Sequence, residues 1–77
     1  MAEPPTDWRP LLGRKVSVRY ALRGDPEHPF SEAIGMLGSV EGEGKDAAIT
    51  IFTKRGESVR MRAADVLAAK VFPPAPG

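Results

Sequence analysis

The closing part of the chain alternates apolar and polar residues on either side of a short glycine turn, and this pattern limits the possible folds most. Residues 49–53 and 58–62 alternate with a period of two, and Gly56 lies in the turn between them. This period places successive side chains on opposite faces of a strand, and glycine readily adopts a positive φ. The segment therefore predicts a β-hairpin whose core-facing residues are Ile49, Ile51, Val59 and Met61.

Two further strands are predicted upstream of this hairpin. Residues 14–22 alternate cleanly, and after a polar loop at 23–31 a second strand runs through 32–40. Gly35 and Gly38 interrupt that second strand, and glycines inside a strand usually mark a bulge or a sharp bend. Such a bend is what a small barrel requires. Four apolar residues of this strand then divide between its faces, with Ile34, Met36 and Val40 on one side and Leu37 on the other.

The third strand is expected at 47–53, the fourth follows the Gly56 turn, and a single helical turn around 64–67 leads into a short last strand at 70–72. The predicted fold is all-β: a small five-stranded SH3-like barrel with one short helical turn before the last strand. We predict a flexible proline-rich segment at 1–10, the barrel at 11–72 and a proline-rich tail or linker at 73–77. Two aromatic residues are expected to act as anchors, Trp8 by folding back onto the barrel and Phe30 by tucking under the loop.

Length and composition exclude several classes of function. A chain of 77 residues with 8 Gly and 8 Pro forms one domain with a modest core. It has no Cys and a single histidine, so we expect no disulfide and no zinc site, and no nucleophile and base pair is defined by a motif. We therefore expect no catalytic residues, no metal site and no cofactor.

The sequence also bears on the location of the protein. The first seven residues are acidic and rich in proline, unlike the basic and apolar parts of a signal peptide. No apolar run approaches the ~20 residues of a membrane-spanning helix. We expect a cytoplasmic protein that does not bind a membrane.

Candidate partner-binding residues lie in the polar loop and on the outer face of the hairpin. The formal net charge of +1 is too small to indicate general nucleic-acid binding, so any basic patch must be local. Acidic residues interleave with the basic ones, a pattern that also fits a solvated surface. The candidates are Arg23, Asp25, Glu27 and His28 in the loop, and Lys54, Arg55, Arg60 and Arg62 on the hairpin.

Four segments, residues 13–22, 31–35, 53–59 and 64–73, together resemble a known family in their order and spacing. They are similar to the SH3-like domain that precedes the catalytic domain in certain actinobacterial GNAT-type N-acetyltransferases. The resemblance implies a five-stranded, partly open barrel that serves as an accessory module. It implies no active site in these residues, because the glycine-rich turn that binds acetyl-CoA in that superfamily belongs to the catalytic domain.

Two hypotheses of function follow. The first is a non-catalytic accessory or binding module, associated with a GNAT-type acetyltransferase, whose partner is a protein or the companion catalytic domain. The second is a small nucleic-acid-binding barrel of the KOW or Sm-like type, in which Lys54, Arg55, Arg60 and Arg62 contact phosphates. In either case we expect a monomer or a weak dimer.

Overall fold

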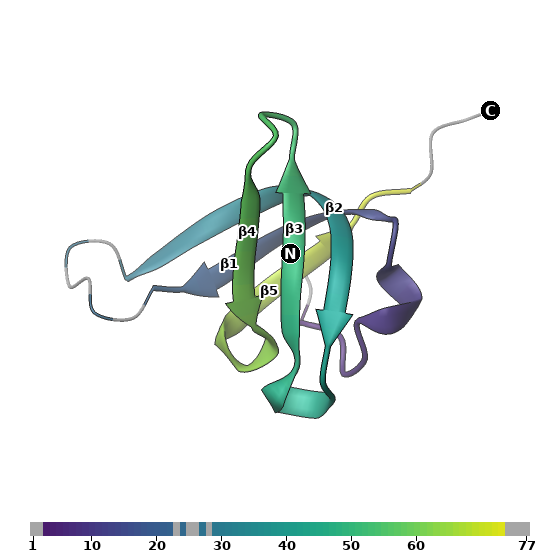
Figure 1. Cartoon of the computed structure of the whole chain (residues 1–77). Helices are drawn as coiled ribbons and strands as arrows, with labels where there is room; N and C mark the ends of the chain where they lie inside the picture. The colour runs from purple at the N-terminus through teal and green to yellow at the C-terminus, as the bar shows by residue number, and fades with distance from the viewer. Residues whose placement is uncertain (1–2, 23, 25–26, 28, 74–77) are drawn as a thin grey trace.

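Five antiparallel strands in one curved sheet make up the fold (Figure 1). The computed structural model describes residues 3–22, 24, 27 and 29–73. The strands follow the order β4-β3-β2-β1-β5 across the sheet, and the helical elements of the described residues are short 3-10 turns. The predicted all-β, five-stranded class is confirmed. The elements are η1 (Arg9–Leu11), β1 (Lys15–Ala21), β2 (Phe30–Glu41), η2 (Gly44–Asp46), β3 (Ala48–Thr53), β4 (Ser58–Arg62), η3 (Ala63–Asp65) and β5 (Val66–Val71).

The longest strand, β2, bends at Gly35 and serves two partners. Residues 30–36 pair with β1, and the pairing with β3 begins at Gly35 and continues to Glu41. Gly35 faces Val16 on one side and Thr53 on the other, and a Cβ atom at this position would overlap the backbone carbonyl of Phe52. Figure 1 shows β2 curving between these two partners, so the predicted bend is present. In Figure 1, β2 begins at the left beside β1, passes behind β4 and β3, and then descends beside β3.

A second irregularity lies at Gly38 and changes which residues face the core. The register between β2 and β3 shifts between Leu37 and Ser39, so residues after the shift face the opposite way from a regular strand. Leu37 is fully buried, Ile34 and Met36 are exposed, and Val40 packs against the core. The expectation that Val40 shares a face with Ile34 and Met36 is wrong, because the extra residue at the bulge moves it to the inner side.

The core fills the concave side of the sheet. Ile49, Ile51 and Met61 are buried and Val59 packs against them, which confirms the predicted inner face of the hairpin. Trp8 is only 2% exposed and belongs to the same cluster, so its predicted return onto the barrel is confirmed. The cluster comprises Trp8, Val16, Val18, Ala33, Leu37, Ile49, Ile51, Met61, Val66 and Ala69.

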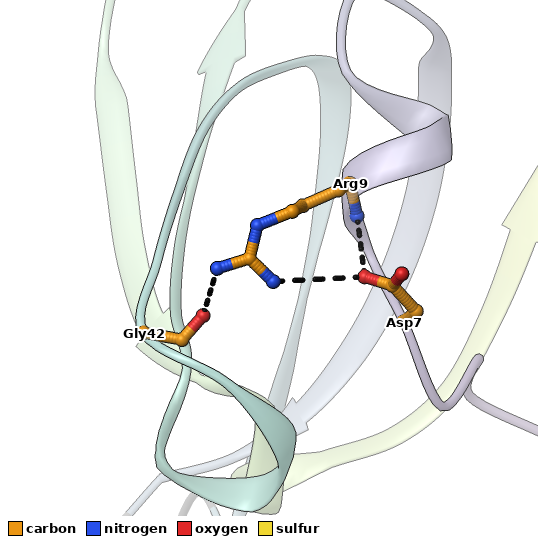
Figure 2. A network of polar contacts seen from close by, with 3 residues as sticks. All are labelled: Asp7, Arg9 and Gly42. Atoms are coloured by element: carbon orange, nitrogen blue, oxygen red, sulfur yellow. Dashed lines mark hydrogen bonds and ion pairs between the residues drawn. The ribbon is translucent and has the colours of Figure 1, made fainter.

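Polar contacts beside Trp8 tie the start of the chain to the turn after β2 (Figure 2). The guanidinium of Arg9 donates a hydrogen bond to the carbonyl oxygen of Gly42 and lies 3.8 Å from Asp7 Oδ1. The backbone N–H of Arg9 also donates to Asp7 Oδ1 at 3.1 Å. These contacts hold the segment that carries Trp8 against the end of the barrel.

Two boundary predictions are corrected by the structure. The helical turn spans Ala63–Asp65 instead of 64–67, and β5 starts at Val66 because Val66 already pairs with Tyr20 of β1.

Phe30 is not a buried anchor: it begins β2 opposite Ala21 and is half exposed. Leu22 N–H donates to the Pro29 carbonyl at 2.9 Å, so the β1–β2 ladder reaches into the loop and turns Phe30 outward. In the described part of the chain, no helix is long and apolar enough to cross a membrane.

The two glycines of β2 predict different responses to alanine. Gly35→Ala places Cβ against the Phe52 backbone, which cannot move without breaking the β2–β3 pairing, so we expect a loss of about 3 kcal/mol in the free energy of unfolding. Gly38→Ala places Cβ against the Phe52 ring, which can rotate away, so we expect a loss of about 1 kcal/mol. Urea unfolding measures both values. Equal losses would contradict the assigned role of Gly35.

Candidate functional site

Four large apolar side chains of β2 and β3 are exposed on the convex face of the sheet. Phe30, Ile34 and Met36 lie an even number of residues apart on β2, and Phe52 of β3 is directly opposite Met36. Each is between 45% and 51% exposed. We call Phe30, Ile34, Met36 and Phe52 the outer patch. Scattered exposed apolar residues are ordinary, whereas a group of neighbouring ones marks an interaction surface.

Local structure fixes the position of Phe52 in this patch. Its ring occupies the space that a side chain at residue 38 would need, and glycine at that position leaves the space open. The ring therefore covers the bulge of β2 and remains on the outer face beside Met36. The bulge and the patch are parts of one local arrangement.

Charged residues of β1 flank the outer patch. The Arg19 guanidinium lies 5.4 Å from the centre of the Phe30 ring and donates to Glu32 Oε1 at 2.9 Å. Lys15 is opposite Met36 in the β1–β2 register, and its Nζ lies 4.9 Å from the Phe72 ring centre. Glu32 lies between Phe30 and Ile34 on the same face of β2, so its ion pair with Arg19 separates Phe30 from the other three residues of the patch. Interfaces commonly combine apolar and charged side chains in this way.

The structure places the four basic candidates of the hairpin in two groups. Lys54 and Arg55 lie in the turn between β3 and β4, whereas Arg60 and Arg62 lie on β4 opposite Thr50 and Ala48. Arg60 Nη2 lies 3.3 Å from Glu41 Oε2. Arg62 shares a shallow pocket with Asp46 and Asp65. Acidic side chains therefore accompany the second group.

The first group of cations lines a groove between the β3–β4 turn and the first half of β2. Its floor includes Tyr20, Ala33 and Val59, and Lys54 and Arg55 belong to the turn that forms one wall. The groove has a volume of about 700 Å³, which is within the ~300–1,000 Å³ of typical ligand sites. We call it the edge groove; its full lining is Lys15, Tyr20, Ser31, Glu32, Ala33, Ile34, Gly35, Thr53, Lys54, Arg55, Glu57 and Val59.

Of the four predicted binding residues in the loop, one lies among the described residues. Arg23, Asp25 and His28 lie outside the described residues, and Glu27 is exposed. The loop joins β1 to β2, so its last residues lead directly into the strand that lines the edge groove. Residue 31, at the end of the predicted loop, is part of the groove wall.

Sequence reasoning placed Ile34 and Met36 on one face but did not identify the outer patch. The available signal was that both faces of residues 34–37 are apolar, since Leu37 alternates with Ile34 and Met36. A strand with one solvated face alternates apolar and polar residues, so two apolar faces indicate that the second face is also covered by other atoms.

In the described residues, no group of three His, Asp or Glu side chains could hold a metal ion. The chemistry these surfaces offer is recognition through apolar burial and charge.

A protein-family model matches most of the chain. The family model described as the Rv0428c N-terminal Sm-like domain matches residues 10–70. Comparisons with curated proteins and with solved structures found no match.

Adjacent residues of β2 give a direct test of the two faces. Leu37 is fully buried and Met36 is half exposed, so Leu37→Ala should lower the free energy of unfolding by about 3 kcal/mol and Met36→Ala by less than about 1 kcal/mol. Chemical denaturation of both variants measures the difference. A large loss for Met36→Ala would show that Met36 belongs to the core and not to a binding surface.

Proposed function

Because the chain belongs to the Rv0428c N-terminal Sm-like domain family, we propose that it is a cytoplasmic, non-catalytic docking module whose outer patch binds a companion protein domain. The observation that carries this proposal is the grouping of Phe30, Ile34, Met36 and Phe52 on one face of the sheet. The description of the family names an N-terminal domain, that is, a domain that precedes another part of a protein. That description supports a role next to a second domain.

The proposed companion is the catalytic domain of a GNAT-type N-acetyltransferase. This choice rests on the resemblance of residues 13–22, 31–35, 53–59 and 64–73 to the domain that precedes such enzymes. The module would contribute binding and orientation and leave the acetyl transfer to the companion. Aromatic side chains in the centre of an interface commonly supply most of its binding energy, which assigns the main contacts to Phe30 and Phe52.

The size of the outer patch suits a partner that is held nearby. Complete burial of one such side chain contributes about 1.5–3 kcal/mol, and since half of each is already covered, docking would add roughly 4 kcal/mol in total. Association also costs translational and rotational freedom, so this gain supports only weak binding between separate molecules, with a Kd of about 1 mM or higher. A short linker supplies a local concentration in the same range, so the contact would be populated between linked domains.

Nucleic-acid binding is the second candidate, since the matched family is Sm-like and the hairpin carries four basic residues. Phosphate contacts need cations that are not already neutralised. Arg60 is paired with Glu41, and Arg19 with Glu32, so two exposed arginines of the outer face are engaged. Lys54 and Arg55 are then the residues on which this function would depend.

Docking can be tested by titrating the isotope-labelled chain with the catalytic domain of an actinobacterial acetyltransferase that carries this type of N-terminal domain. We expect amide shifts at Phe30, Met36 and Phe52. A Met36→Ser, Phe52→Ser double variant should bind at least tenfold more weakly, because about 2 kcal/mol of apolar burial is removed. Arg62→Ala, at the far end of β4, is the control. Unchanged binding by the double variant would refute docking through the outer patch.

Salt dependence separates the two candidates. We expect at most weak binding of single-stranded oligouridylate, lost between 50 and 200 mM salt, as is typical of a few phosphate contacts. Fluorescence anisotropy measures this affinity for the chain, for a Lys54→Glu, Arg55→Glu variant, which should abolish any binding, and for an Arg60→Glu, Arg62→Glu variant, which we expect to be little affected. Tight binding that either variant abolishes would make nucleic acid the principal partner.

A further inference from the structure

The first half of β2 is paired on one side only. β2 faces β1 from Phe30 onward, but its pairing with β3 ends at Gly35, opposite Thr53. The chain then leaves the sheet through the turn at 54–57 and returns as β4, which pairs with β3. Residues 30–34 therefore have a strand on the β1 side, and in the described residues the register places none on the other.

The direction of the backbone groups on this edge follows from the ladder. Leu22 N–H donates to the Pro29 carbonyl, and Leu37 N–H donates to the Arg14 carbonyl, so these are bonded pairs of the β1–β2 ladder. Bonded and non-bonded pairs alternate along antiparallel strands. Counting from either end, residues 31, 33 and 35 are bonded to β1. The N–H and C=O groups of Phe30 and Glu32 point the other way, toward the open side.

The edge groove lies along this open side. Ser31, Ala33 and Gly35 line it from β2, and the turn residues Lys54, Arg55 and Glu57 line it from across. Thr53, where β3 ends, is part of the same lining, and among the described residues its buried Oγ1 has no hydrogen-bond partner. The groove therefore combines outward-directed backbone groups with an apolar floor.

The charges around the groove select its occupant. Lys15, Lys54 and Arg55 line it together with two acids, and one of those acids, Glu32, already lies 2.9 Å from Arg19. The remaining balance is positive. A second copy of this chain would bring the same cations to the edge, and like charges disfavour such pairing. An acidic segment is complementary.

We infer that the edge groove is a strand-addition site that takes an extended acidic peptide segment of a partner protein onto the open edge of β2. Main-chain hydrogen bonds to Phe30 and Glu32 provide the register, as in other cases of strand addition. Alternate side chains of the segment face the floor at Tyr20, Ala33 and Val59, and the others reach solvent. This inference rests on the proposed role in protein binding but uses the main-chain edge of β2 and the groove beside it, which share Phe30 and Ile34 with the outer patch.

The probe is an end-blocked octapeptide of alternating valine and glutamate, titrated into the isotope-labelled 77-residue chain. We expect shifts and slowed amide exchange at Phe30 and Glu32, and affinity at least tenfold higher than for the valine and lysine counterpart. Glu32→Pro removes the outward N–H and should weaken binding at least tenfold. Glu32→Ala is the matched control, because it loses the same carboxylate and keeps the N–H, and it should bind no more weakly than the original chain.

A charge variant keeps the test independent of whether Glu32→Pro folds. Lys54→Glu with Arg55→Glu should reverse the preference between the two peptides, while Arg60→Glu with Arg62→Glu changes the net charge equally and should preserve it. Three outcomes would overturn the inference: no binding at millimolar peptide, equal binding of both peptides, or shifts confined to Met36 and Phe52. The Met36→Ser, Phe52→Ser variant should still bind the peptide, so failure of the edge groove is distinguishable from failure of docking.

Discussion

The bend of β2 at Gly35 is the constraint on which the rest of the structure depends. The Phe52 carbonyl approaches this residue so closely that only a hydrogen atom fits where other residues carry Cβ. The close approach lets one strand pair with β1 along its first half and with β3 along its second half. The sheet thereby curves around its core, and a chain with no cysteine encloses Val16, Ile49 and Ile51 completely.

The same bend produces both candidate surfaces. Because β3 ends opposite Gly35 and turns away, the first half of β2 keeps one edge without a strand partner in the described residues. Because β2 is convex on its outer side, Ile34 and Met36 project outward on either side of the bend while Leu37 enters the core. Both candidate surfaces thus follow from how the sheet closes, and neither requires an added loop or helix.

The alternation of apolar and polar residues, together with the positions of the glycines, was sufficient to predict the strands that show this alternation. The alternation of 14–22 and the Gly56 turn, whose φ is 83°, identified β1 and the β3–β4 hairpin, and the glycines of β2 identified its irregularities. Pattern could not show that Gly38 shifts the register and turns Val40 inward, because that depends on pairing with β3. The pattern also could not show that Phe30 faces outward, because β2 begins two residues before its expected start and Phe30 is part of it.

The edge groove and the outer patch meet at Ile34, which belongs to both. A strand added along residues 30–34 would run beside the outward side chains of Phe30 and Ile34, since neighbouring strands place side chains on shared faces. A partner that supplies an acidic strand followed by an apolar surface could therefore use both sites at once. If the outer patch binds a partner as proposed, its apolar burial alone supports only weak binding, so the additional main-chain hydrogen bonds would decide whether docking needs a covalent linker.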